Sequence, residues 1–131
     1  MHSAERVEFD RYLDQVLAGL PALAKSTLDE IPLIVEDYPS PVIRKAEGLR
    51  YRDELCGYFE GVPKPEQSIS DGYSLPNRIY VFREGNVALA TDEEGHVDQA
   101  ELVRQIRITV LHEIGHYLGM TEEELTELGY D

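Results

Sequence analysis

The amino-acid sequence predicts an α+β fold in a single domain that spans residues 1–131. Three observations support this class: helical periodicity near both ends of the chain, short β-branched and aromatic runs between them, and a length suited to one core. Hydrophobic residues make up 42% of the chain and charged residues 29%, which are ordinary proportions for a globular protein. Because no apolar run approaches the roughly 20 residues of a membrane span, we expect no membrane partner.

The N-terminal region is predicted to contain two helices. Over residues 9–20, apolar residues recur every three or four positions with charged residues between them, which is typical of an amphipathic helix. Gly19 and Pro21 interrupt this pattern, and PALAKSTLDE then forms a second short helix, since proline is tolerated in a first helical turn. The acidic start of the chain lacks the features of a secretory signal, so we expect a cytoplasmic protein.

Three short runs in the middle of the chain are predicted to be strands: IPLIVED, LCGYFEG and RIYVFRE. Each is rich in β-branched or aromatic residues, and Pro32 stands near the beginning of the first, where a strand tolerates a missing N–H. SPVIRKAEGLRYRD shows no clean period. VPKPEQSISDGYSLPN is predicted to be a loop, and GNVALATDEEG to be two turns around a short apolar piece.

The last third of the chain is the most regular part. Asp98 is placed to cap a helix, with Glu101 three residues later as in a capping box. This helix carries one apolar stripe, formed by Val103, Ile106, Val110, Ile114 and Leu118. Gly119 is expected to end it, and TEEELTEL to begin a short terminal helix with Thr121 as its cap and Glu124 three residues on.

The long helix contains the motif HEIGH, which places His112 and His116 four residues apart. Helical residues at this spacing have Cβ atoms about 5–6 Å apart, so both imidazoles can direct a nitrogen at one Zn²⁺ ion. Glu113 is rotated about 100° from His112, which removes it from the ligand set but keeps it close enough to accept a proton from water. The pattern predicts hydrolysis of a peptide bond, in which zinc activates the water and Glu113 is the general base. The alternative is an ordinary helix with two solvent-facing histidines.

The helix is expected to have a metal-binding side that is separate from its apolar stripe. On a helical wheel the two histidines lie about 200° from the stripe, on a side shared with Gln105, Ile108 and Thr109. Gly115 lacks a side chain, so we expect another element or a substrate backbone to approach closely at that position.

A third metal ligand is needed, because a catalytic zinc usually has three from the protein. It must be His, Asp or Glu, since Cys56 is the only cysteine and is expected to have a structural role. Glu122 is our first candidate, because the chain can bend at Gly119 and return a carboxylate to the metal. The alternatives that remain open are Glu123, Glu124, Glu127 and His96. The acidic run also suits the first turn of a helix, whose dipole favours negative charge.

The segment HEIGHYLGMTEEEL resembles the extended zincin signature HExxHxxGxxH/D, with Glu122 at the third-ligand position. With LCGYFEGVP, LPNRIYVFR, VRQIRITVLHEIGHYLGM and ELTELG, it is similar to the small bacterial zincin-like metallopeptidase family over residues 55–129. The resemblance implies a minimal zincin-like domain, in which a small mixed sheet packs on the active-site helix. It also implies zinc ligation by His112 and His116 and a base role for Glu113. Glutamate replaces the third histidine and no Met-turn methionine follows the motif, which places the chain outside the secreted metzincins.

Three functions are compatible with these features. The first is a zinc peptidase with a peptide or protein substrate, which zincins align along an edge strand. RIYVFRE is the predicted edge strand, and an ordinary core strand is the alternative. The second is a metal-stapled, non-catalytic interaction domain.

The third function is a nuclease of the HGxxHxxGxxH type. Glu113 argues against it, as does the formal charge of −14 from 26 acidic and 12 basic residues, which repels phosphate. We therefore expect no nucleic-acid partner, and we expect a monomer.

Overall fold

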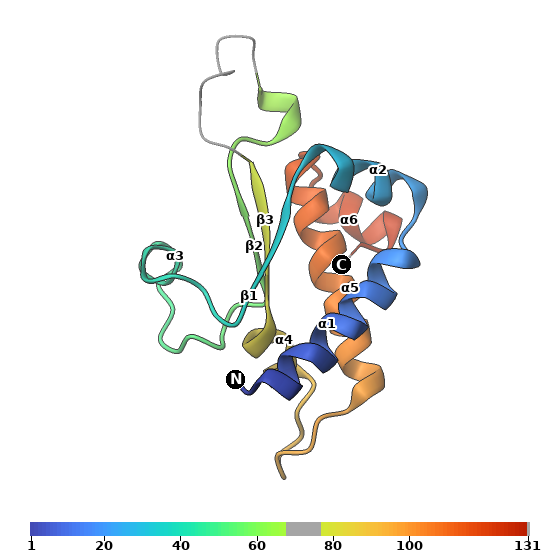
Figure 1. Cartoon of the computed structure of the whole chain (residues 1–131). Coiled ribbons are helices and arrows are strands. Elements are labelled where there is room, and N and C mark those ends of the chain that lie inside the picture. The colour runs from blue at the N-terminus through green and yellow to red at the C-terminus, as the bar shows by residue number, and fades with distance from the viewer. Residues whose placement is uncertain (68–76, 131) are drawn as a thin grey trace.

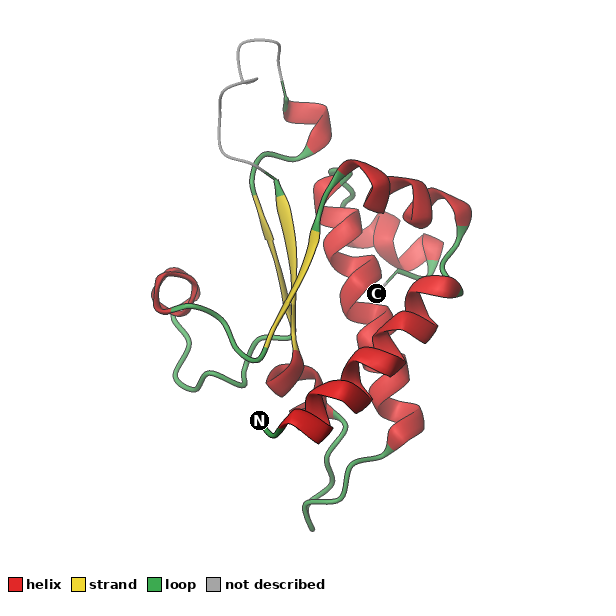
Figure 2. Ribbon diagram, viewed as in Figure 1, coloured by secondary structure: helices red, strands yellow, loops and turns green. Residues whose placement is uncertain are grey.

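The computed structural model describes residues 1–67 and 77–130, and its architecture is mixed α+β (Figures 1 and 2). The helices of the described residues are α1 (Ser3–Ala18), α2 (Ala22–Glu30), α3 (Pro41–Glu47), α4 (Arg83–Leu89), α5 (Gln99–Tyr117) and α6 (Glu122–Leu128), with a 3₁₀ turn, η1 (Lys64–Glu66). The strands are β1 (Leu33–Glu36), β2 (Gly57–Glu60) and β3 (Arg78–Phe82). The predicted fold class is confirmed. Among the described residues, no helix combines the length and apolar character needed to span a membrane.

The three strands form one mixed sheet in the order β1-β3-β2. β1 runs parallel to β3, and β2 runs antiparallel to it. Ile79 and Val81 of β3 are fully buried, while Tyr80 and Phe82 stack on each other with ring centroids 5.8 Å apart. β3 is therefore the central strand, and the prediction that RIYVFRE is the edge strand is wrong. β3 is hydrogen-bonded to β1 on one side and to β2 on the other. The most apolar strand gains most from this central position, because its side chains are buried there.

The longest helix, α5, packs against β2 and β3 of the sheet and against α1 and α2 (Figure 1). The centre of its predicted apolar stripe, Ile106, Val110 and Ile114, is fully buried, and Val103 and Leu118 at the ends of the stripe are partly buried. The stripe meets a buried face of α1 that includes Phe9, Leu13 and Val16. On the other side of the sheet lies α3 (Figure 2). One face of α5 is thus fixed in the core, which leaves its opposite face available for the histidines.

Two helices arise where the sequence did not predict them. α3 occupies residues 41–47 because Ser40 accepts a hydrogen bond from the Ile43 N–H at 3.3 Å, proline holds the first turn, and Gly48 ends the helix at φ 65°. With Ile43 as its one buried residue, α3 shows no apolar period. α4 follows β3 directly, in place of the predicted turn. The predicted loop at 62–77 contains η1, and its residues 68–76 lie outside the described residues.

Candidate metal centre

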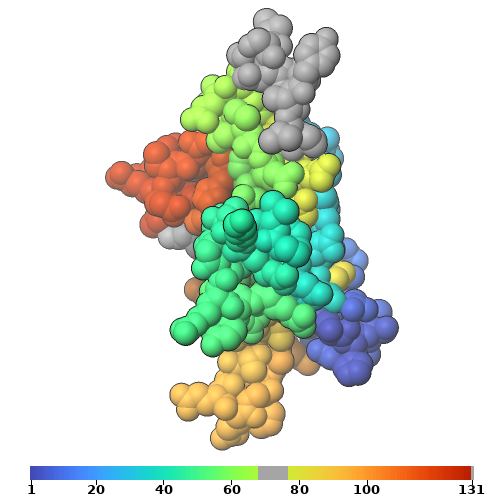
Figure 3. Space-filling view, turned by 90° about the vertical axis from the view of Figure 1, so that its left-hand side faces the viewer, coloured from blue at the N-terminus to red at the C-terminus, as the bar shows by residue number. Residues whose placement is uncertain are grey.

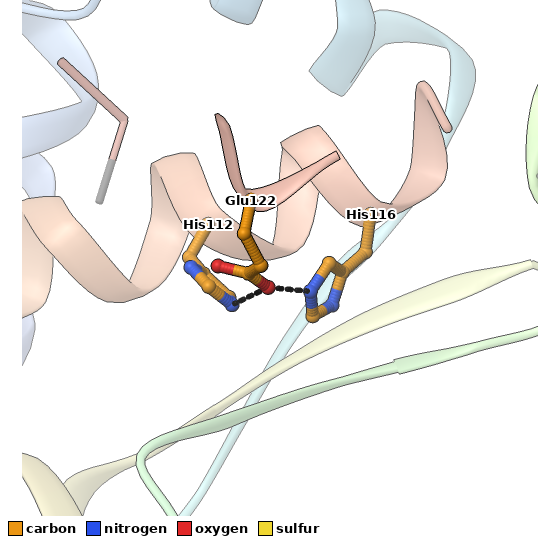
Figure 4. Close-up of side chains that lie close together, drawn as sticks. All are labelled: His112, His116 and Glu122. Carbon is orange, nitrogen blue, oxygen red and sulfur yellow. Dashed lines mark ion pairs between the residues drawn. The ribbon is translucent and has the colours of Figure 1, made fainter. Parts of the chain in front are cut away.

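Three predicted ligands converge at the end of α5 (Figure 4). Glu122 Oε1 lies 3.8 Å from His112 Nε2 and 3.8 Å from His116 Nε2. One ligand atom from each residue lies within 4.8 Å of the other two, and this is the one such group of three or more metal-binding side chains within residues 1–67 and 77–130. The two imidazole rings have centroids 4.4 Å apart. The side chains therefore already point at a common position.

The return of Glu122 depends on how α6 packs on α5. Gly119 adopts φ 76°, which reverses the chain after α5. Thr121 caps α6 in a full capping box: its hydroxyl accepts from Glu124 N–H at 3.1 Å, and its own N–H donates to the Glu124 carboxylate at 3.2 Å. A Cβ at Gly115 would collide with the side chain of Leu125. The predicted close approach at Gly115 is therefore made by α6, and it places Glu122 beside the histidines.

The donor set fits zinc. Two imidazole nitrogens and one carboxylate oxygen are ligands that Zn²⁺ takes in catalytic sites, where a fourth position stays open. Tetrahedral ligands at about 2.0–2.1 Å from one ion lie about 3.3–3.4 Å apart, so the 3.8 Å separations of Glu122 Oε1 from the two imidazole nitrogens require only a small contraction. The alternative ligands lie outside this group, and two of them have other partners. Glu124 caps α6, and the exposed His96 lies beside Asp92 and Glu94.

The buried side chain of Glu113 lies next to the candidate ligands. Its Oε1 is 3.0 Å from His116 Nδ1, so a proton on Nδ1 is donated to the carboxylate. This tautomer leaves the Nε2 lone pair of His116 facing Glu122. The hydrogen bond to Glu113 raises the pKa of His116, and partial burial opposes the shift.

These residues line a cleft of about 870 Å³ between α5 and β2. The α5 side is formed by Gln105, Ile108, Thr109, His112 and His116, which the helical wheel places on one side, and also by Glu113. The other side includes β2 and the residues around η1. Figure 3 shows the surface of η1 beside that of α6, on the face that also presents α3. The cleft thus has the size of a ligand site and holds the candidate metal ligands and Glu113 together.

Gly57 brings β2 close to α5, a role that the sequence analysis did not identify. A Cβ at Gly57 would lie 2.6 Å from Thr109 Cγ2, 3.1 Å from Glu113 Cγ and 3.0 Å from the Tyr80 carbonyl oxygen. Any larger residue would push the strand away from Glu113. An isolated glycine within a strand is a recognised signal of such an approach.

Asn86 is the second residue that the sequence analysis missed. It is fully buried, and its Nδ2 donates to Cys56 O at 3.1 Å and to Phe82 O at 2.8 Å. Its Oδ1 accepts from the Thr109 hydroxyl at 2.9 Å. One side chain therefore connects the start of β2, the end of β3 and α5. Burial raises the pKa of the Cys56 thiol to about 11, which supports its predicted structural role.

Comparison with known proteins identifies the family of this chain. A comparison with curated proteins finds no match. A family model described as zincin-like metallopeptidase matches residues 28–130, which is well over half of the chain and reaches beyond the resemblance at residues 55–129 to include β1 and α3. This chain therefore belongs to the zincin-like metallopeptidase family.

Proposed function

We propose that this protein is a zinc-dependent peptidase, with His112, His116 and Glu122 as zinc ligands and Glu113 as the general base. The observation that carries the proposal is the position of Glu113. Its side chain is buried, accepts a hydrogen bond from His116 and lines the cleft beside the group of candidate ligands. A buried carboxylate next to a metal site is what proton transfer requires, whereas a purely structural site needs no such group.

The ligand side chains are supported by the protein around them. When bound, zinc supplies Lewis-acid chemistry, which polarises a carbonyl and lowers the pKa of water. His116 is oriented by its hydrogen bond to Glu113, and Glu122 by the capping box and by the packing of Leu125 against Gly115. Such preorganisation reduces the conformational entropy that ligands lose on binding.

Glu113 performs the proton transfers in this proposal. One carboxylate oxygen accepts a proton from the attacking water, whose oxygen bonds to the carbonyl carbon of the substrate. The same oxygen then donates that proton to the amide nitrogen as the C–N bond breaks. The products are a new carboxyl group and a new amine, and Glu113 returns to its ionised state.

The outer edge of β2 is the proposed docking strand for the substrate, in place of β3. Among the described residues β2 pairs only with β3, and its other edge borders the cleft. Phe82 N–H donates to Cys56 O at 2.8 Å, so by the alternation of an antiparallel ladder Gly57 and Phe59 direct their N–H and C=O groups away from β3. An extended peptide can hydrogen-bond to these groups. Gly57 brings that peptide close to Glu113.

Hydrolysis of a quenched fluorogenic peptide library tests the proposal. We expect cleavage by zinc-loaded protein, loss of cleavage with a chelator, recovery with added zinc, and loss in Glu113→Gln. A protein that binds zinc and is stabilised by it, but cleaves no peptide, would instead be the metal-stapled interaction domain.

The charge of the chain supports a peptide over a nucleic acid as substrate. A formal charge of −14 repels phosphate, and the glycine of the related nuclease pattern is replaced by Glu113. The monomeric state stays a prediction. Sedimentation of the zinc-loaded protein tests it.

A further inference from the structure

The charge of the cleft is one-sided. Glu47 from α3, Glu66 from η1 and Glu113 from α5 line it, so carboxylates enter from three separate elements. Within the described part of the chain, no lysine or arginine lines the cleft. Residues 68–76, SISDGYSLP, contain no lysine or arginine either. Apart from the candidate metal site itself, these segments therefore place no cationic side chain in the cleft to neutralise Glu47 and Glu66.

The one lysine on η1 is held away from the cleft. Lys64 stands between Pro63 and Pro65, which both line the cleft, but its Nζ lies 3.0 Å from each carboxylate oxygen of Glu30 on α2. Glu30 also accepts a hydrogen bond from the Tyr117 hydroxyl at 3.2 Å. The interaction with Glu30 raises the pKa of Lys64, which keeps the ammonium charged and engaged. Glu66 is therefore not neutralised by its nearest cation in sequence.

The negative charge near the cleft also affects the pKa of Tyr58. Within residues 1–67 and 77–130, neither Glu47 nor Glu66 forms an ion pair. The pKa of Tyr58, on the docking strand, is raised by burial first and then by the negative charges of Glu47, Glu60 and Glu113. Three carboxylates, those of Glu47, Glu66 and Glu113, thus line the cleft where a substrate would lie, and Glu60 on β2 adds to the negative charge near Tyr58.

The length of the cleft sets how many substrate residues it holds. The lining residues on and just after α5 run from Gln105 to Gly119, which corresponds to about 21 Å of helix or about six residues of an extended peptide. Pro65 packs against Gly119, so Glu66 lies at the end of the cleft beyond His116. A peptide centred on Glu113 therefore passes near Glu66 within about three residues of its scissile bond.

We propose that the substrates are cationic peptides, with lysine or arginine within about three residues of the scissile bond. This inference rests on the proposed peptidase function. Such side chains meet the carboxylates of Glu47 and Glu66, which form no ion pair among the described residues, whereas acidic peptides meet like charge at these two positions. The formal charge of −14 adds long-range attraction for a cationic substrate, which raises the rate of encounter at low salt.

The test compares kcat/KM for three matched sets of fluorogenic peptides. The sets share randomised central residues and carry flanking Lys and Arg, Ser and Gln, or Asp and Glu. We expect the cationic set to be cleaved about tenfold or more faster than the acidic set at low ionic strength, with the advantage shrinking as salt screens the charges. Glu66→Gln and Glu47→Gln should each reduce that advantage about two- to fivefold.

The matched control is Asp14→Asn, which removes the same charge from an exposed position on α1. It should leave the preference unchanged, because α1 contributes no residue to the cleft. A binding measurement separates the two proposals: the anisotropy of a fluorescent Lys- and Arg-containing peptide is followed with zinc-loaded Glu113→Gln protein. We expect tighter binding than for the acidic peptide, and weaker binding when Glu66→Gln is added.

Each outcome bears on one proposal. Cleavage without charge preference, or equal effects of Glu66→Gln and Asp14→Asn, would show that the inference is wrong while the peptidase proposal stands. Glu66-dependent binding of cationic peptides without any cleavage would reject the peptidase proposal and keep the charge preference. A protein that neither cleaves nor binds cationic peptides preferentially contradicts the inference.

Discussion

Glu113 has two roles that a single substitution can separate. Its carboxylate accepts a proton from water in the proposed reaction, and it also accepts the Nδ1 proton of His116 at 3.0 Å. A glutamine at this position retains a carbonyl oxygen that can accept from Nδ1, so the tautomer of His116 that offers Nε2 to a metal is preserved. The same glutamine cannot act as a base at neutral pH.

We therefore predict that Glu113→Gln keeps about one zinc per chain but lowers hydrolysis by the roughly 10²–10⁴-fold that general acid–base catalysis contributes. His112→Ala and His116→Ala should lose the metal, and Glu122→Ala should bind it markedly more weakly. Zinc per chain, measured by plasma emission after dialysis, and peptide hydrolysis are the two readouts.

Glu123→Ala is the matched control for Glu122, because Glu123 lies in the same helical turn but outside the ligand group. It should retain zinc. Metal loss in Glu113→Gln, or full retention in Glu122→Ala, would overturn the corresponding role.

The site residues differ in how far the sequence predicts them. The relative positions of His112, Glu113 and His116 follow from the geometry of one helix, and the position of Glu122 follows from a bend after that helix. Their spacing in the sequence is therefore enough to predict that they lie close together. Gly57 and Asn86 act through contacts between distant segments: Asn86 meets Thr109 across 23 residues of chain. No sequence pattern shows which distant residue a buried asparagine or a strand glycine contacts, so the roles of these two residues are visible only in the packed structure.

At the scale of elements, the sequence predicts which segments are strands but not the order in which they pair. β3 is buried on both faces, since Ile79, Val81 and Phe82 are all fully or almost fully buried. Such a strand belongs in the centre of a sheet, which is why the predicted edge position of RIYVFRE is wrong. α3 and α4 have seven residues each, too few for a helical period to stand out, although Ser40, Pro41 and Gly48 carry the capping signals of α3.

The packing of α6 on α5 predicts the effect of adding one methyl group. Gly115→Ala should displace Leu125 and with it α6, because the new Cβ occupies the space of that side chain. We expect zinc affinity to fall about tenfold or more as Glu122 moves away, and overpacking to cost about 1–3 kcal/mol, offset by about 1 kcal/mol of helix propensity. Competition with a metal-binding dye measures the affinity, and urea unfolding the stability.

Gly19→Ala is the control, since its Cβ would meet only carbonyl oxygens at an ordinary 3.8 Å. Adding Leu125→Ala to Gly115→Ala should restore part of the zinc affinity by making room. If Gly115→Ala binds zinc as tightly as the unmodified chain, α6 packing does not position Glu122.

The connection between Asn86 and Thr109 predicts a second effect, on stability. Thr109→Val keeps the methyl group that meets Gly57 but removes the hydroxyl, which leaves the buried Asn86 Oδ1 without its donor. We expect a loss of about 1–3 kcal/mol in the free energy of unfolding. Thr109→Ser keeps the hydroxyl and removes the methyl group, at a cost of about 0.5–1.5 kcal/mol. Urea unfolding compares the two, and a larger loss in Thr109→Ser would show that the contact with Gly57 matters more than the hydrogen bond.

At the scale of the whole molecule, an ion-pair network joins distant parts of the chain. Asp37, just after β1, accepts hydrogen bonds from Arg6 on α1 at 2.7 Å and from Arg83 at the start of α4 at 2.9 Å. Arg83 also donates to Asp10 on α1 at 3.0 Å. The side chains of Asp37 and Arg83 are 15% and 13% exposed, so solvent screens this pair less than a surface pair. The network therefore fixes α1 against the end of the sheet that leads into α4 and Asn86.

This network predicts how stability depends on pH. The hydrogen bond from Arg6, and that from Arg83 after it, lowers the pKa of Asp37 below its usual range, although burial opposes the shift. A carboxyl whose folded pKa is lowered stabilises the fold above its unfolded pKa, about 3.9, and this contribution disappears as the pH falls through the folded pKa. Asp37→Asn should thus reduce the free energy of unfolding at pH 7 by about 1–3 kcal/mol, and the difference from the unmodified chain should narrow steadily below about pH 4. Urea unfolding of metal-free protein across this pH range measures the difference, with Asp14→Asn on the exposed face of α1 as the control. A difference that stays constant from pH 7 down to pH 2 would mean that Asp37 contributes through packing and neutral hydrogen bonds, because only an ionised carboxylate makes the stabilisation depend on protons.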